Sequence, residues 1–176
     1  MPRPREELTV GEWAVVGLLA EGPSHGFAVA RAMAPGGEVG KVWTVRRPLV
    51  YRAIETLTAM GLVRTAGTVA SASGPQRTVL QSTPAGKRAV TRWLRQPVDH
   101  VRDARSLLML KLLFLTRREA DLAPLLTAQR ALFAAIAERL ERAADAAEGF
   151  DRALTLWRFE STTAAVRFVE AMLADA

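Results

Sequence analysis

The sequence contains no cysteine and only two histidines, His25 and His100. Without cysteine the chain can form no disulfide, cannot bind zinc through thiolates and has no thiol nucleophile. Two separate histidines are a poor basis for a metal site, which needs several ligands at close spacing. We therefore expect no metal and no cofactor. His25 lies between a turn and a helix, where a turn-stabilising hydrogen bond is the favoured role.

Long apolar runs and familiar catalytic motifs are missing as well. The most apolar segment, residues 107–115, is interrupted by Lys111. It is much shorter than a membrane span, which needs roughly 20 residues. The charged segment 1–7 is not followed by a signal-peptide pattern, which favours a cytoplasmic protein without membrane contact. No nucleophile elbow, Walker loop or dinucleotide fingerprint occurs, so we expect no enzyme.

Positive charge is confined to one half of the sequence. Residues 1–96 hold 13 Lys or Arg against 6 Asp or Glu, a net charge of +7, whereas residues 97–176 hold 11 against 12, a net charge of −1. A basic segment joined to a nearly neutral one is typical of a polyanion-binding domain with an attached assembly domain. Charge alone is equally compatible with an ordinary solvated surface.

Three helices are predicted in the first third of the chain. The first runs from Thr9 to Glu21, with Thr9 as N-cap and Glu12 as its capping-box partner. The second spans about residues 26–33. The third begins at Pro48, a favoured first helical residue, and runs to about residue 60, where Gly61 suits the left-handed position that follows a helix. Its apolar face holds Val50, Ala53, Ile54 and Leu57, which leaves Pro48, Tyr51, Arg52 and Glu55 on the opposite face.

Two strands and a fourth helix are predicted next. Residues 62–66 and 77–81 have strand character and flank a segment of small residues, which indicates a hairpin with a long tip. Thr83 caps a helix that starts at Pro84. The order of three helices, two strands and a helix predicts a winged helix-turn-helix DNA-binding domain over residues 1–96.

Residues 97–176 are predicted to form an all-helical dimerisation domain, which makes the protein mainly α. A helix over 104–116 is apolar nearly all round, and a long helix over 118–148 is followed by another over 151–173. The last helix has an apolar stripe made by Leu154, Trp157, Ser161, Ala164, Phe168 and Leu173. We expect one chain to leave apolar surface around 107–115 uncovered and therefore to form a homodimer.

The sequence resembles the PadR-type transcriptional regulators with an extended C-terminal helical domain. The resemblance depends on the order and spacing of short segments between residues 8 and 95, and beyond residue 100 it is one of pattern only. The matching segments are Leu8-Thr9, Val16-Gly17-Leu18-Leu19, Gly22-Pro23-Ser24-His25-Gly26-Phe27, Trp43, Val50-Tyr51-Arg52-Ala53-Ile54, Leu57, Gly61-Leu62-Val63, Gln76-Arg77-Thr78-Val79 and Thr83-Pro84-Ala85-Gly86.

The resemblance implies a dimeric DNA-binding repressor that responds to a small molecule, commonly an aromatic one. Three departures stand out. Phe27 and Val79 occupy positions where the family often has Tyr, and Pro48-Leu49 replaces a small Gly-Ser or Gly-Thr pair. The last change lies at the start of the helix expected to face DNA, so the base sequence read there is expected to differ.

Candidate DNA-binding residues lie first of all just before the third helix and on its outward face. Arg46 and Arg47 are placed to contact phosphates, and Arg52 to contact a phosphate or a guanine edge. Tyr51 either donates its hydroxyl to a phosphate or packs beneath the helix.

The wing supplies further candidates. Arg77, with Gln76, opens a wing strand and would reach a phosphate or the minor groove. Lys41, which precedes the third helix, and Arg64 are weaker candidates of the same kind.

Trp93 and Trp157 are candidates for an aromatic effector site, although tryptophans at such positions are more often part of a core. The sequence thus favours a regulator that binds double-stranded DNA in a sequence-specific manner, most simply a repressor released by a small aromatic or drug-like effector. The alternative is a winged-helix adaptor that binds proteins and not DNA.

Overall fold

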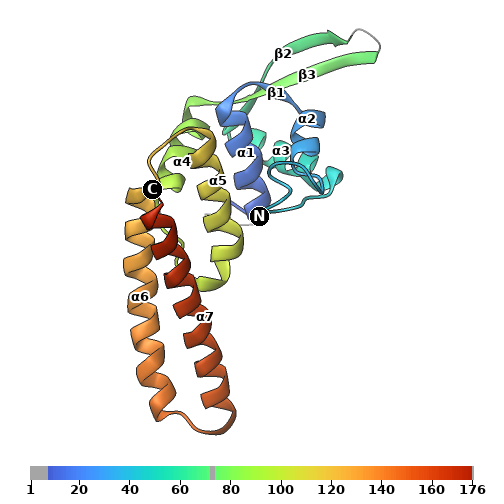
Figure 1. Ribbon diagram of the computed structural model, residues 1–176. Coiled ribbons are helices and arrows are strands. Elements are labelled where there is room, and N and C mark those ends of the chain that lie inside the picture. The colour runs from blue at the N-terminus through green and yellow to red at the C-terminus, as the bar shows by residue number, and fades with distance from the viewer. Residues whose placement is uncertain (1–7, 72–73, 176) are drawn as a thin grey trace. The chain divides into compact units, whose positions relative to one another are not determined.

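The computed structural model describes residues 8–71 and 74–175 and divides into two units, Met1–Trp93 and Leu94–Ala176 (Figure 1). The first unit contains α1 (Val10–Glu21), β1 (Ser24–His25), α2 (Gly26–Ala32), α3 (Arg47–Ala59), β2 (Val63–Ser71), β3 (Gly74–Ser82) and most of α4 (Pro84–Arg95). The second contains a 3-10 turn (Val101–Asp103), a π-helical turn (Ala104–Leu108), α5 (Met109–Arg117), α6 (Ala123–Ala146) and α7 (Gly149–Ala174). The predicted winged helix-turn-helix followed by a helical region is confirmed.

The predicted helix caps of the first unit are present. At the start of α1 the Thr9 amide donates to a Glu12 carboxylate oxygen at 2.7 Å, and the Glu12 amide donates to the Thr9 hydroxyl at 3.3 Å. Gly61 follows α3 with a φ of 70°. Glycine adopts this left-handed conformation without steric cost. The Thr83 hydroxyl accepts the Gly86 amide at 3.1 Å and so caps α4.

The sheet has one strand more than the sequence predicted. β1 pairs antiparallel with β3, Ser24 opposite Leu80 and His25 opposite Val79, and the strand order is β1-β3-β2. A strand of two residues is too short for alternation of polar and apolar residues to reveal it. The β2–β3 register shifts between Thr65 and Gly67, so a bulge lies where the hairpin extends beyond the core.

The core of the first unit forms where α1 and α3 pack together. Its fully buried side chains include Val15, Val16, Leu19, Val50 and Leu57. The four apolar residues predicted to face inward from α3 are all buried. Trp13 and Trp93 stack at the edge of this core, with ring centroids 4.7 Å apart and planes 7° from parallel.

The second unit is built on the α6–α7 hairpin and on two polar side chains within its core. The buried Gln129 of α6 accepts the Val98 amide at 2.7 Å and donates to the Val98 carbonyl at 3.0 Å, which fixes the segment after α4 to α6. Lys111 of α5 is also buried, and its ammonium donates to the Gln96 carbonyl. None of the helices described over residues 8–71 and 74–175 combines the length and the apolar character that crossing a bilayer requires.

One predicted helix boundary in this unit is wrong. The helix expected over 104–116 is present, but its first segment, Ala104–Leu108, is π-helical and regular α-helix starts at Met109. The helix expected from residue 118 begins at Ala123, because the chain turns at Glu119, whose φ is 51°. Pro124 in the first turn of α6 is the signal that sequence reasoning missed, since proline is tolerated there and not inside a helix.

The expected location of the uncovered apolar surface is also wrong. Leu108, Leu110 and Phe114 are completely buried in the single chain. On α7, in contrast, Phe150 is 79% exposed and Trp157 is 70% exposed. The buried residues of α7 are Thr162 and Val169, and neither belongs to the predicted apolar stripe of this helix.

Candidate nucleic-acid interface

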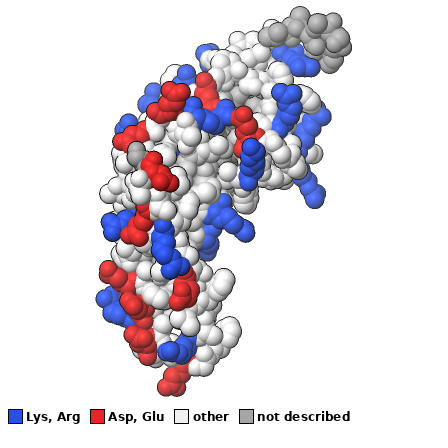
Figure 2. Space-filling model, viewed as in Figure 1, with Lys and Arg blue, Asp and Glu red and all other residues white. Residues whose placement is uncertain are grey.

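The solvent side of α3 carries a row of large side chains. The helix begins at Arg47, one residue before the predicted start, with Arg46 as N-cap and Pro48 in its first turn. Arg46, Arg47 and Arg52 are exposed, as the helical period predicted. Leu49, noted in the sequence as part of an unusual pair but not as a contact residue, is 53% exposed beside them. In Figure 2 blue side chains predominate along the right-hand margin of the first unit, whereas red and blue alternate along the α6–α7 hairpin.

Arg46 and Arg52 share a shallow hollow on this surface. It lies between the start of α1, segment 43–46 and α3, and Trp43, Leu49 and Met60 contribute apolar side chains to it. Two guanidinium groups beside exposed apolar side chains provide both charge for phosphates and contact surface for bases. Lys41 is exposed in the segment that leads to this hollow.

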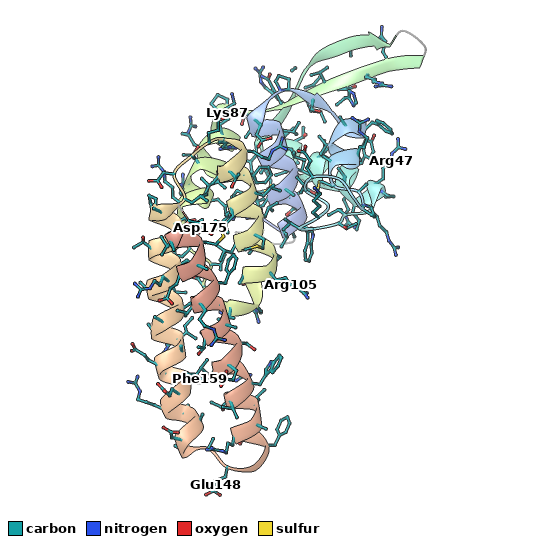
Figure 3. The ribbon with its side chains drawn as sticks, viewed as in Figure 1. Arg47, Lys87, Arg105, Glu148, Phe159 and Asp175 are labelled. Atoms are coloured by element: carbon teal, nitrogen blue, oxygen red, sulfur yellow. The ribbon has the colours of Figure 1, made fainter. Side chains whose placement is uncertain are left out.

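A second group of side chains, the Phe27 cluster, consists of Arg47, Tyr51 and Arg77 around the ring of Phe27 at the start of α2. The Arg47 guanidinium carbon lies 5.2 Å from the centroid of the Phe27 ring and 5.7 Å from that of Tyr51. The Arg77 guanidinium carbon of β3 lies 6.0 Å from the Phe27 centroid. Arg47 is labelled in Figure 3, where it stands beside α2. The fold therefore brings Arg77 of the wing and Arg47 of α3 to the same aromatic ring, which no spacing in the sequence reveals.

Tyr51 packs at the junction of α2 and α3. A Cβ atom on Gly26 would lie 2.8 Å from Tyr51 Cε1. Only a glycine therefore lets the ring approach the first residue of α2 this closely. The Tyr51 side chain is nevertheless 37% exposed. The packing role that the sequence left open is thus present, while a role of the hydroxyl at a phosphate stays a prediction.

The remaining wing candidates differ in their surroundings. Gln76 and Arg77 are exposed on β3. Arg64 is exposed on β2, and its Nε donates at 3.0 Å to the Gln81 amide oxygen when that amide is oriented with its oxygen toward Arg64. Arg64 is therefore partly engaged within the wing. The tip at residues 72–73 lies outside the described residues.

The two effector candidates lie in different settings. Trp93 is buried and stacks on Trp13 in the first unit. Trp157 lines an open cavity of about 810 Å³ in the second unit, formed by segment 99–105, α6 and α7. The charged side chains around this cavity are Asp99, Arg102, Arg105, Arg139 and Arg158. Trp93 thus belongs to the first unit and Trp157 to the second, and a shared effector site stays a prediction.

His25 makes the turn-stabilising hydrogen bond expected from the sequence, because its Nδ1 accepts the Ala28 amide at 3.0 Å. Within the described part of the chain, no group of three or more His, Asp or Glu side chains is arranged to hold a metal ion.

Comparisons with known proteins gave matches among solved structures only. No model of a known family matches the sequence, and no curated protein matches it. A crystal structure of Bacillus subtilis PadR in complex with operator DNA is similar at 24% identity over 94% of this chain and 98% of that chain, with a TM-score of 0.46. The structure of smu.1604c from Streptococcus mutans UA159 is similar at 13% identity over 93% and 98% of the two chains, with a TM-score of 0.44. The PadR-like transcriptional regulator BC1756 from Bacillus cereus is similar at 13% identity over 98% of each chain, with a TM-score of 0.43.

Proposed function

We propose that this chain is a cytoplasmic transcriptional regulator that binds double-stranded DNA in a sequence-specific manner. The observation that carries the proposal is the arrangement of α3, which buries its apolar face and presents Arg46, Arg47 and Arg52 to solvent. A helix with this arrangement in a winged helix-turn-helix enters the major groove with its N-terminal turns. No catalytic role is proposed.

In this proposal some exposed side chains of α3 contact bases and others contact phosphates. Arg52, in the second turn of α3, contacts base edges, and Leu49 supplies apolar contact to a thymine methyl group. Arg46 and Arg47 contact phosphates, and the Tyr51 hydroxyl adds a neutral donor.

The side chains outside α3 serve mainly the DNA backbone. Arg77 and Gln76 contact the backbone or the minor groove from the wing. Lys41 and Arg64 contribute mainly to the positive potential of the surface.

A homodimer is the second part of the proposal, with α7 as the interface. Phe150, Trp157 and Phe168 are exposed by 79%, 70% and 37%. At about 100° per residue, positions 150, 157 and 168 fall within about 20° of one another, so the three rings form one stripe along the helix. A continuous stripe of aromatic rings in water is unfavourable in a monomer and is removed from water when two copies pair.

A small-molecule effector that releases a repressor from DNA is the third part. The cavity beside Trp157 has four arginines and one aspartate among its charged lining residues. Within residues 8–71 and 74–175 none of these arginines forms an ion pair with a carboxylate. The excess of positive charge favours an anionic ligand, and the Trp157 indole, which the cavity shares with the proposed dimer interface, favours a flat one.

The test is a titration of purified protein against DNA. A duplex selected from a random pool by the wild-type protein is compared with a scrambled duplex at several salt concentrations. We expect Arg52→Ala to cost about 1–3 kcal/mol on the selected duplex and to narrow the difference between the two duplexes. The control Arg88→Ala removes an exposed arginine of α4 outside this surface. If the wild-type protein enriches no sequence from the random pool and does not bind the scrambled duplex, the adaptor alternative replaces the proposal.

A further inference from the structure

His25 has a defined protonation pattern, because one of its ring nitrogens is committed to the backbone. Nδ1 accepts the Ala28 amide at 3.0 Å and caps α2. A nitrogen that accepts a hydrogen bond carries no proton, so in the neutral ring the proton resides on Nε2. Nε2 is therefore a hydrogen-bond donor.

The group opposite this donor is another donor. Nη1 of Arg77 lies 3.3 Å from Nε2 of His25. The opposite tautomer would let Nε2 accept from Arg77, but it would place a proton on Nδ1 and break the bond to Ala28. A charged ring would carry protons on both nitrogens and satisfy neither contact. No protonation state of His25 satisfies both neighbours at once.

The surroundings of this donor pair carry excess positive charge. The guanidinium carbons of Arg47 and Arg77 lie 5.2 Å and 6.0 Å from the centroid of the Phe27 ring. No carboxylate in residues 8–71 and 74–175 forms an ion pair with either arginine. The side chains of His25, Arg47 and Arg77 come from β1, α3 and β3, so the fold holds three donors from separate elements around one aromatic ring.

We propose that His25 Nε2 and the Arg77 guanidinium together hold one phosphate oxygen, with Arg47 contributing positive charge from within the Phe27 cluster. The two nitrogens are 3.3 Å apart. An oxygen can therefore lie within about 2.8 Å of each, the usual length of a charge-assisted hydrogen bond. It turns two opposed donors into two hydrogen bonds and offsets the repulsion between the guanidinium groups. The proposed occupant is a backbone phosphodiester of DNA, so this part rests on the proposed function.

His25 enters the proposal as a neutral donor, which separates its effect from that of a cation. His25→Asn keeps a side-chain oxygen that caps α2 and removes the ring donor. Arg77→Gln removes a charge, and Arg88→Gln removes an exposed charge elsewhere in the unit. We expect His25→Asn and Arg77→Gln each to weaken binding to a duplex by about tenfold. The slope of affinity against salt should drop by about one for Arg77→Gln and stay unchanged for His25→Asn.

The double variant tests whether the two donors share one oxygen. If they do, His25→Asn combined with Arg77→Gln weakens binding much less than the product of the two single effects. Losses that multiply would overturn the shared site, as would a His25→Asn protein that binds DNA as well as wild type. In the control double variant, which combines His25→Asn with Arg88→Gln, the effects of the two substitutions on DNA affinity should multiply.

Ring ¹⁵N spectra of the full-length protein test the site without relying on affinity. The chain has two histidines, His25 and the exposed His100, so the spectrum of either His25→Asn or His100→Asn assigns the signals. We expect the free protein to show His25 protonated on Nε2 and that signal to move when duplex DNA is added. A proton on Nδ1 in the free protein would refute the proposal, even if His25→Asn failed to fold.

Titration with inorganic phosphate separates this proposal from the proposed function. If wild-type protein binds no duplex but phosphate moves the His25 signal, and Arg77→Gln abolishes the movement, the anion site stands and DNA binding fails. If neither DNA nor phosphate moves the signal, the site itself is refuted.

Discussion

Lys111→Met removes a buried ammonium from the second unit and should stabilise the protein at neutral pH. Burial lowers the pKa of Lys111 from 10.5 to about 8, against the opposing effect of the Asp99 carboxylate. The difference corresponds to about 3 kcal/mol of unfavourable burial of the charged form, at about 1.4 kcal/mol per tenfold change. Methionine removes this cost but leaves the Gln96 carbonyl without its lysine donor. Each hydrogen bond lost with the ammonium costs about 1 kcal/mol, so we expect a net gain of at most about 2 kcal/mol at neutral pH.

The gain in the free energy of unfolding should decrease as the pH rises. Below pH 8 the lysine is protonated in both the folded and the unfolded chain, so the cost is fully present. Between pH 8 and 10.5 the folded chain releases the proton while the unfolded chain retains it, and the stability of wild type rises with pH. The advantage of Lys111→Met should thus shrink over this range.

Urea unfolding followed by circular dichroism at pH values from 7 to 10.5 measures the effect. The control is Lys87→Met, which removes an exposed lysine from α4, where the ammonium is in water in both states. Taking the difference between each variant and wild type cancels the titration of all other groups. If the difference in the free energy of unfolding between Lys111→Met and wild type stays constant across this pH range, the ammonium is solvated in the folded protein and the reasoning is refuted.

Three further outcomes are expected. Trp157→Glu, which places a charge in the aromatic stripe of α7, should convert a dimer at low micromolar concentration into a monomer in sedimentation velocity, and an unchanged dimer would exclude α7 as the interface. Wild-type DNA affinity should fall with a log–log salt slope of about −0.9 per phosphate contacted, and a flat profile would exclude the arginine surface. Gly40→Ala should lower the urea midpoint strongly because its Cβ would collide with the Ala34 carbonyl oxygen, whereas the control Gly22→Ala has nothing within 4 Å and should change little.

The sequence predicted the first unit well because its elements are bounded by local chemistry. Thr9 with Glu12 marks the start of α1, and Gly61 marks the end of α3. Each of these signals acts through hydrogen bonds or backbone angles within a few residues, which a single sequence contains. The Phe27 cluster could not be found in this way, since it joins Arg47 to Arg77 through tertiary structure.

The second unit was harder to predict because its sequence does not determine which side of each helix faces the core. Alanine and leucine occur on several sides of α6 and α7, so more than one face satisfies a three- and four-residue period. The predicted apolar stripe of α7 includes Trp157, whereas the structure exposes Trp157 and buries Thr162. Which face of such a helix is covered is decided by its neighbour and, in our proposal, by a second copy of the chain.

In the first unit the backbone around α3 is held by hydrogen bonds while the arginine side chains of α3 are exposed, which suits the proposed binding of DNA. The Thr83 hydroxyl donates to the Gly61 carbonyl at 2.7 Å, and the Thr83 amide donates to the Leu62 carbonyl at 2.9 Å, so the end of α3 is bonded to the end of β3. A Cβ on Gly86 would collide with that same Leu62 carbonyl oxygen, so the start of α4 packs closely against this segment. These contacts join α3 to the base of the wing. Because these contacts already hold the backbone of α3 in place, we expect little backbone order to be gained when DNA binds. In the proposed function, selectivity between base sequences then depends on which side chains α3 exposes.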